Sequence, residues 1–208
     1  MRGVHVVSSK VIDDEEIVYK GNQLSPMFVY NKTKGTANVM FFRGPMVLDT
    51  SDMVDAEDVV NNDNIRSRDA INILAELPFV DLVGGVALQR MMIRKITDVL
   101  QGTVSNIYWR IEGDDIKFRT SPIPVGSKPE YKKLSVSIAT KTPASVLIHI
   151  GINITAGPDA PSFAGSLTDM SDAYKQDAEI YNLMRNMADA ITMELNDIYE
   201  ASMKVLPK

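Results

Sequence analysis

The spacing of hydrophobic positions changes several times along this chain of 208 residues, and each spacing predicts a different element. An apolar run at 37–42 fits a buried strand, and a second, mainly apolar run follows at 70–77. The second run is also compatible with a short helix, but its length and the proline that follows it favour a strand. From Gly85 to Leu100, apolar residues recur at every fourth position, which predicts an amphipathic helix of about four turns.

Apolar and polar residues alternate after this helix, as is typical of strands. The alternation predicts strands at 107–111, 116–118, 134–140 and 146–154, with an irregular, proline-rich loop at 120–130. The chain then ends in a helix predicted over 171–203, along which one apolar face persists. This order of strands, helix, strand meander and final helix predicts a mixed α+β fold, in which helices cover one face of a mixed sheet.

Composition narrows the class of protein. A chain of this length with 45% hydrophobic residues can bury one core, so residues 1–208 are expected to form a single domain. The net charge of −5 argues against a broad surface for nucleic acid or anionic lipid. No apolar stretch has the length of a transmembrane helix or of a signal-peptide core, which indicates a cytoplasmic protein.

The scarcity of cysteine and histidine excludes several kinds of functional site. The chain has no cysteine, which excludes disulfide bonds, cysteine-ligated metals and a cysteine nucleophile. His5 and His149 are the two histidines, too few for a histidine-rich metal site, so no metal is expected. The residues do not indicate a cofactor. Twelve methionines are typical of soft core packing, with a methionine-lined pocket as the alternative.

The strands at 134–140 and 146–154 carry the candidate site. Their polar positions are Ser135, Ser137, His149, Gly151 and Asn153, and these are predicted to form the floor of a ligand pocket. Gly151 would let a ligand approach the backbone. Lys133 enters at the rim, where its ammonium group can neutralise a phosphate or a developing oxyanion. The alternatives are a half-exposed sheet face with a solvated lysine, and for His149 a hydrogen-bonded sheet histidine.

Two further residues could support such a site. Arg43 follows the buried run at 37–42, and it is either an anion ligand or part of a structural ion pair. Asp114 and Asp115 lie between two predicted strands, where they form a tight turn or hold a magnesium ion or a ribose hydroxyl.

Six motifs carry a family resemblance. They are F-R-G at 42–44, D-M-V-D-A-E-D at 52–58, L-Q-R-M-M-I at 88–93, G-D-D-I at 113–116, K-L-S-V-S-I-A-T at 133–140 and I-H-I-G-I-N-I at 148–154. With these motifs the chain resembles, nearly end to end, the archaeal domain-of-unknown-function family 366. Its second half is also similar to the catalytic domains of lipoate ligases, octanoyltransferases and biotin ligases.

The resemblance to these ligases implies a mixed, mostly antiparallel sheet covered by helices. It places Lys133 where the superfamily keeps its functional lysine, which contacts an activated carboxyl group or its phosphate, and it favours Asp115 as the carboxylate near the site. Two features depart from the pattern. Neither Arg43-Gly44-Pro45 nor Gly84-Gly85 has the spacing of a phosphate-gripping loop, and no cysteine can carry an acyl group.

Two kinds of function stay open. The first is a transferase or ligase that acts on an activated carboxylate and binds a small carboxylate or nucleotide-like ligand. Lys133 would be its catalytic residue, with Arg43 and Asp115 in support. The second is a non-catalytic binding protein, or a structural protein that forms a homodimer, on the same fold. The partners expected are a small molecule or a second copy of the chain, rather than nucleic acid or a membrane.

Overall fold

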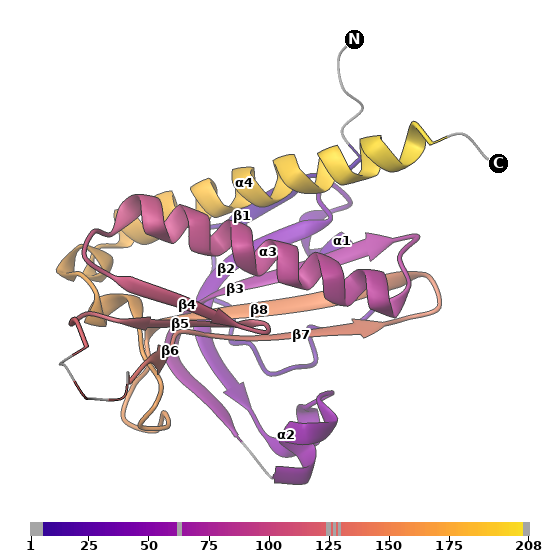
Figure 1. The fold of residues 1–208 in the computed structure, drawn as a ribbon. Coiled ribbons are helices and arrows are strands. Elements are labelled where there is room, and N and C mark those ends of the chain that lie inside the picture. Colours follow the sequence, from indigo (N-terminus) through magenta and orange to yellow (C-terminus); the bar gives the residue numbers. More distant parts are fainter. Residues whose placement is uncertain (1–5, 62–63, 124–125, 127, 129, 206–208) are drawn as a thin grey trace.

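A five-stranded sheet in the order β1-β2-β3-β8-β7 forms the framework of the fold (Figure 1). Its strands are β1 (Ser9–Ile12), β2 (Val39–Leu48), β3 (Ile65–Pro78), β7 (Ser135–Lys141) and β8 (Ser145–Thr155). β1 runs parallel to β2, and the other neighbouring pairs are antiparallel, so the predicted mixed, mostly antiparallel sheet is confirmed. The computed structural model describes residues 6–61, 64–123, 126, 128 and 130–205.

A smaller antiparallel sheet lies beside this framework. Its strands are β4 (Tyr108–Glu112), β5 (Asp115–Arg119) and β6 (Lys132–Lys133). Two hydrogen bonds join it to the start of β7, from Leu134 N to Ile116 O at 2.8 Å and from Ile116 N to Ser135 Oγ at 2.9 Å. The chain therefore passes directly from the small sheet into the edge strand of the large one.

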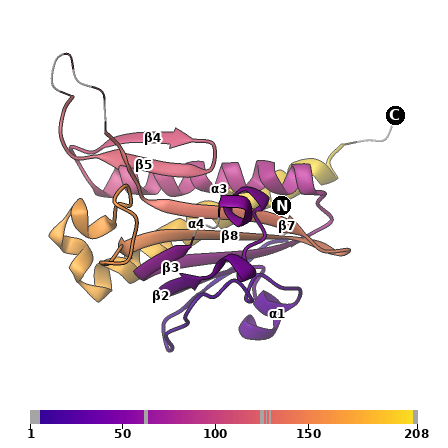
Figure 2. The same cartoon turned by 90° about the horizontal axis from the view of Figure 1, so that it is seen from below.

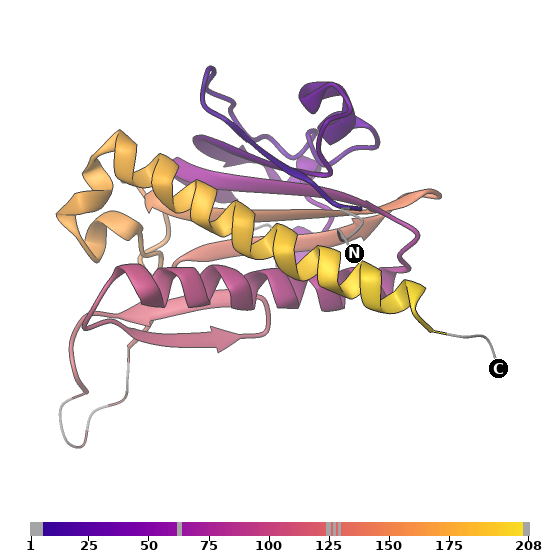
Figure 3. The ribbon, with the colours of Figure 1, turned by 90° about the horizontal axis from the view of Figure 1, so that it is seen from above.

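Two long helices, α3 (Leu82–Thr103) and α4 (Asp177–Met203), cover one face of the large sheet (Figure 3). The opposite face carries α1 (Phe28–Thr33), α2 (Ala56–Asn61) and the 3-10 turn η1 (Thr50–Asp52) (Figure 2). Two further 3-10 turns, η2 (Leu167–Asp169) and η3 (Asp172–Lys175), lead into α4. In the described part of the chain, no helix combines the length and the apolarity needed to cross a membrane.

Both faces of the central strands are buried, which explains why apolar residues dominate 37–42 and 70–77 in the sequence. On the helix side, Ile148, Ile150 and Ile152 of β8 pack with α3 and α4 in one core. On the other side, Met40 and Phe42 of β2 belong to a second core near α1. The strands predicted at 37–42 and 70–77 are confirmed, and both are longer than their apolar runs.

The C-terminal helix differs from its prediction. Gln176 has an extended backbone (φ −97°, ψ 127°), so the segment begins with η3, and α4 starts only at Asp177. The buried stripe of α4 ends at Leu195, about one turn earlier than predicted, and Ile198 is 37% exposed. Beyond this point Tyr199 still packs against the core, and its hydroxyl donates to Pro78 O at 3.0 Å.

Candidate functional site

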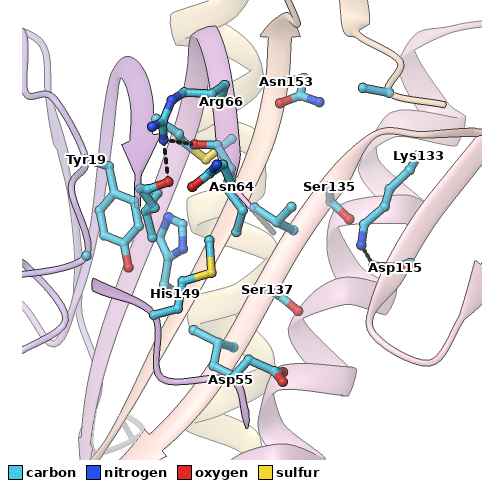
Figure 4. Close-up of a pocket in the computed structure, with 18 of the residues that line it drawn as sticks. Tyr19, Asp55, Asn64, Arg66, Asp115, Lys133, Ser135, Ser137, His149 and Asn153 are labelled. Atoms are coloured by element: carbon cyan, nitrogen blue, oxygen red, sulfur yellow. Dashed lines mark hydrogen bonds and ion pairs between the residues drawn. The ribbon is translucent and has the colours of Figure 1, made fainter. Parts of the chain in front are cut away.

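A cavity of about 650 Å³ opens where the two sheets meet, on the face away from α3 and α4 (Figure 4). One wall comes from the small sheet and the edge strand β7, and the other comes from the loops at 19–24 and 52–55, the end of β2 and the start of β3. Six of the predicted site residues line the cavity: Asp115, Lys133, Ser135, Ser137, His149 and Asn153. Arg43 and Gly151 lie outside its described lining.

Lys133 lies at the rim of the cavity and contacts Asp115. Its Nζ atom is 2.8 Å from Asp115 Oδ1, and the two side chains are 31% and 24% exposed. The backbone of Lys133 is held as well, because its N–H donates to Phe163 O and its carbonyl accepts from Gly165 N, each at 2.8 Å. The ammonium group is therefore fixed in position and only partly exposed to water.

The turn between β4 and β5 presents Asp115 to the cavity. Gly113 occupies the left-handed region, at φ +63°, that this tight turn requires. Asp114 anchors the turn, because its Oδ2 atom accepts hydrogen bonds from Ser137 Oγ at 2.9 Å and from Gln89 Nε2 at 3.1 Å. Gln89 also donates to Ser137 Oγ at 2.7 Å. Residues of β7 and α3 therefore hold the position of Asp115.

Gln89 supports the site from behind the cavity lining, and sequence reasoning missed it. It lies on the apolar stripe of α3, one turn before Met92 and Ile93, and it is only 4% exposed. A buried polar side chain needs a hydrogen-bond partner, so a glutamine on an apolar helix face was the signal that could have identified it. The structure supplies these partners in Asp114 and Ser137.

The strand register divides the predicted pocket floor between two faces of the sheet. The opposed pairs of β7 and β8 are Ser135–Ile152, Val136–Gly151, Ser137–Ile150 and Ile138–His149. Directly opposed residues of an antiparallel pair share a face. The two serines therefore lie on the helix-covered face, whereas His149 and Gly151 lie on the other. The prediction of one common face is wrong, but the cavity still reaches both sets because β7 is an edge strand.

His149 is a neutral residue at the base of the cavity. Its ring stacks on Tyr19, with centroids 3.6 Å apart and an interplanar angle of 16°. Asn72 Nδ2 donates to Gly44 O, which leaves Asn72 Oδ1, 3.1 Å from His149 Nε2, as the acceptor for the ring N–H. Burial lowers the pKa of His149 to about 3. It is thus a hydrogen-bonded sheet histidine and a poor base at neutral pH; His5 lies outside the described residues.

Gly151 makes room for a side chain of the protein itself. A Cβ atom at this position would collide with Met46 Sδ, so Met46 fills the space that was predicted for a ligand. Met46 and Met53 line the cavity, while other methionines such as Met40 are buried in the core. Both interpretations of the methionine content therefore apply. Asn153 Nδ2 donates to Gly165 O at 3.0 Å, which holds the loop after β8 beside the cavity.

Arg43 forms the structural ion pair that was the alternative to an anion site. Its Nε atom is 3.1 and 3.0 Å from the two carboxylate oxygens of Asp69, and its Nη2 atom is 2.7 Å from Oδ2. Its Nη1 atom is 2.7 Å from Asp177 Oδ1 at the start of α4. These hydrogen bonds, above all those that Arg43 donates to Asp69, raise the pKa of Arg43. Arg43 therefore joins β2, β3 and α4.

Substitution of Arg43 by alanine is expected to lower the free energy of unfolding by about 2 kcal/mol, because it leaves the largely buried Asp69 without its partner. Asp177, which is 77% exposed, adds little to this value. Urea unfolding at pH 7 measures the change. Arg185→Ala is the matched control, since Arg185 is 53% exposed and 3.5 Å from Asp13. Equal losses in the two variants would contradict the assignment.

The opposite wall of the cavity comes from residues that the sequence did not identify. Tyr19 is 1% exposed, and burial raises its pKa. Arg66 donates to Ile65 O at 3.1 Å and to Leu48 O, and it forms an ion pair with Asp49. These residues lie near chain turns, where no hydrophobic period marks them.

The layered sheet, with its two long helices on one face, defines a class of protein by its fold, which is that of biotin protein ligase. The structure of biotin protein ligase from Aquifex aeolicus gives a TM-score of 0.52 at 12% identity, over 93% of this chain and 71% of that one. A mutant of the same enzyme in complex with biotin gives a TM-score of 0.50 at 12% identity, over 90% and 70% of the two chains. At this identity the likeness shows the fold alone.

Within that class, the chain belongs to the family described as domain of unknown function (DUF366), which matches residues 8–206. The uncharacterised protein MJ0805 of Methanocaldococcus jannaschii is 29% identical over 201 residues, which cover 93% of this chain and 82% of that protein. A protein of unknown function from Pyrococcus horikoshi gives a TM-score of 0.79 at 26% identity, over 97% and 98% of the two chains. The resemblance drawn from the six motifs is confirmed.

Proposed function

We propose that this protein binds a small molecule with a single carboxylate in the cavity, and that Lys133 neutralises this carboxylate. The observation that carries the proposal is the fixed position of Lys133 at the rim of a large cavity, 2.8 Å from Asp115. A ligand carboxylate that shares or displaces Asp115 would form a charge-assisted hydrogen bond with the ammonium group. The volume lies in the range of about 300–1,000 Å³ that is usual for small-molecule sites.

The charges around the cavity favour one carboxylate over several. The described lining carries the acidic residues Asp52, Asp55, Asp114 and Asp115 and the basic residues Arg66 and Lys133. Arg66 is held by Asp49 and also donates to the carbonyls of Leu48 and Ile65, whereas the described partner of the Lys133 ammonium group is Asp115 alone. Lys133 is therefore the cation better placed to meet a ligand. A polyanion such as ATP would face a wall with an excess of negative charge. Of the two ligand types predicted from the sequence, the small carboxylate therefore fits better than the nucleotide.

The wall of the cavity opposite the small sheet suits an apolar ligand body. Its apolar lining residues are Leu24, Met46, Leu48, Met53 and Ile65. Unbranched methionine side chains adapt to ligand shape. The neutral Tyr19–His149 stack at the base offers no charge to a second ionised group. An acyl or aryl acid fits both parts of the cavity, because its apolar body contacts the apolar wall and its carboxylate contacts Lys133.

The chemistry would be transfer of an acyl or aryl group that arrives already activated. Lys133 would then stabilise the oxygen that gains negative charge in the transition state, with Asp115 holding the ammonium group in place. The glycines that could have opened a phosphate loop are packed instead, because a Cβ atom at Gly44 would collide with Ile17 O and one at Gly85 would collide with Val146. The same packing favours a second candidate function, a binding protein without activation chemistry.

Thermal shift measurements with matched ligand pairs test the binding step. Octanoate, lipoate and biotin are each compared with the corresponding primary amide, which keeps the body and removes the charge. At least one carboxylate should raise the melting temperature while its amide does not, with about 2.7 kcal/mol of stabilisation at a hundredfold excess over Kd. Equal shifts for acid and amide, or a shift with ATP alone, would refute the proposal.

Turnover then separates the two candidate functions. Octanoyl-AMP is a preactivated acid, and its attack by hydroxylamine releases AMP and forms the hydroxamate. Faster AMP release with the protein than without it supports the transferase. Binding of octanoyl-AMP without faster release supports the non-catalytic binding protein.

A further inference from the structure

The small sheet has an outer face on which tyrosine and arginine side chains stack, here called the Tyr/Arg face (Tyr108, Arg110, Arg119 and Tyr131). Tyr108 of β4 lies opposite Arg119 of β5, and Arg110 lies opposite Lys117. The alternate residues point inward, where Phe118 is fully buried in the main core. The Tyr/Arg face is thus the side of the small sheet that the core does not use.

Stacking holds the Tyr/Arg face in a defined geometry. The Arg119 guanidinium lies 3.8 Å from the centre of the Tyr108 ring. Arg110 and Arg119 are each 5.6 Å from the centre of the Tyr131 ring, so one ring orients two guanidinium groups. Guanidinium groups ordered in this way lose little further entropy when they form hydrogen bonds with a partner.

The Tyr/Arg face is open to solvent and adjoins the cavity. Tyr108 is 43% exposed. The Arg110 side chain is 51% exposed and forms an ion pair with Glu112 at 2.5 Å, which a partner carboxylate would share or displace. Figure 2 looks onto the small sheet with α3 behind it, from the same side as α2. Lys117 on this face lies directly opposite Lys133 in the strand register, so the face runs up to the rim of the cavity. A bound partner would cover the entrance.

The charge of the small sheet is opposite to that of the whole chain. Its three strands carry five cationic and two acidic side chains, whereas the chain has a net charge of −5. On the Tyr/Arg face Arg110 and Lys117 share the single carboxylate of Glu112, which leaves a net positive charge there. Arg119 forms no ion pair with a carboxylate among the described residues. An acidic partner is therefore attracted here and repelled elsewhere, which fixes its orientation. Tyrosine and arginine are also the residues most enriched where proteins bind one another tightly.

We propose that the Tyr/Arg face is a docking site for an acidic segment of a partner protein, with the Arg110 and Arg119 guanidinium groups pairing with its carboxylates. A planar guanidinium matches a carboxylate with two parallel hydrogen bonds. A protein segment fits better than nucleic acid, because a long polyanion would meet the acidic remainder of the chain beyond these few cations. The proposal does not depend on which ligand occupies the cavity.

Fluorescence anisotropy with a labelled glutamate-rich peptide tests this docking site. The intact protein should bind the peptide, and binding should weaken as salt is added. Arg110→Ala combined with Arg119→Ala should weaken binding about tenfold. The control combines Arg94→Ala and Arg185→Ala, which remove the same charge from exposed positions on α3 and α4, and it should change binding less than about twofold.

Three outcomes would overturn the proposal. They are no binding by the intact protein, equal weakening in the two double variants, and tighter binding of an oligothymidylate of the same length, which would identify a nucleic-acid surface instead. Melting curves establish that each variant folds. Arg110→Gln alone, at a half-exposed side chain, repeats the test if the double variant does not fold.

Discussion

The free energy of unfolding is expected to fall by about 4–5 kcal/mol between pH 6.5 and pH 3 through the titration of His149 alone. Burial lowers the pKa of the folded-state ring to about 3, whereas the unfolded chain binds the proton near pH 6.5. Between these values the unfolded state binds more protons, so stability falls as the pH falls, by about 1.4 kcal/mol per pH unit. The contribution is fully present above pH 6.5.

Urea unfolding at pH 7, 6 and 5 measures this slope, and His149→Phe provides the control. The phenylalanine keeps an aromatic ring against Tyr19 and leaves Asn72 Oδ1 without its donor, a cost that does not change with pH. Carboxylates that titrate near pH 5 affect both proteins alike. The native protein should therefore lose stability more steeply than the variant. Parallel curves would show that His149 is protonated in the folded state.

The strands and the long helix could be predicted from the sequence because burial determines how apolar residues are spaced along it. Phe41 and Ile73 belong to strands with cores on both sides, so few polar residues interrupt their apolar runs. Helix α3 buries one side, so its apolar residues recur about every four positions. The start of α4 could not be predicted in this way, because the single extended residue Gln176 separates α4 from η3 without disturbing the apolar pattern.

The sequence could not predict on which face of the sheet each candidate site residue lies, because this depends on the pairing of two strands. Polar positions in β7 and β8 were assumed to match, but the register places Ser137 opposite Ile150. A shift of one residue in an antiparallel pair moves every side chain to the other face. Alternation within each strand does not contain this information. The hydroxyl of Ser137 is used instead to anchor Asp114 and the turn.

The far wall of the cavity and the role of Arg43 depend on contacts between distant segments. Arg43 meets Asp177 across 134 residues, and Tyr19 meets His149 across the sheet. Neither contact has a local pattern in the sequence. Lys133 and Asp115 could be found because a family resemblance placed them together, and the structure brings their charged atoms to 2.8 Å. Their role in ligand binding stays a proposal.

Substitution of Lys133 by methionine is expected to weaken binding of the preferred carboxylate at least about tenfold, because it removes a charge-assisted hydrogen bond and keeps the apolar stem. Isothermal titration with the ligand found by thermal shift measures the change. Lys132→Met is the matched control from the adjacent position. Lys132 is 3.5 Å from Asp169 and belongs to no described part of the cavity lining, so its replacement should leave affinity unchanged. Equal effects of the two substitutions would place the carboxylate elsewhere.

Asp115→Asn is expected to act in the opposite direction and strengthen binding of the same carboxylate a few-fold. In the free protein, Asp115 occupies the ammonium group that the ligand needs, and its charge repels the ligand carboxylate. At about 5 Å and an effective dielectric of about 20 this repulsion is about 3 kcal/mol, and partial exposure of both side chains reduces it to about 1 kcal/mol. A weaker affinity would instead mean that Asp115 mainly positions Lys133, and that its hold on the ammonium group outweighs its competition with the ligand.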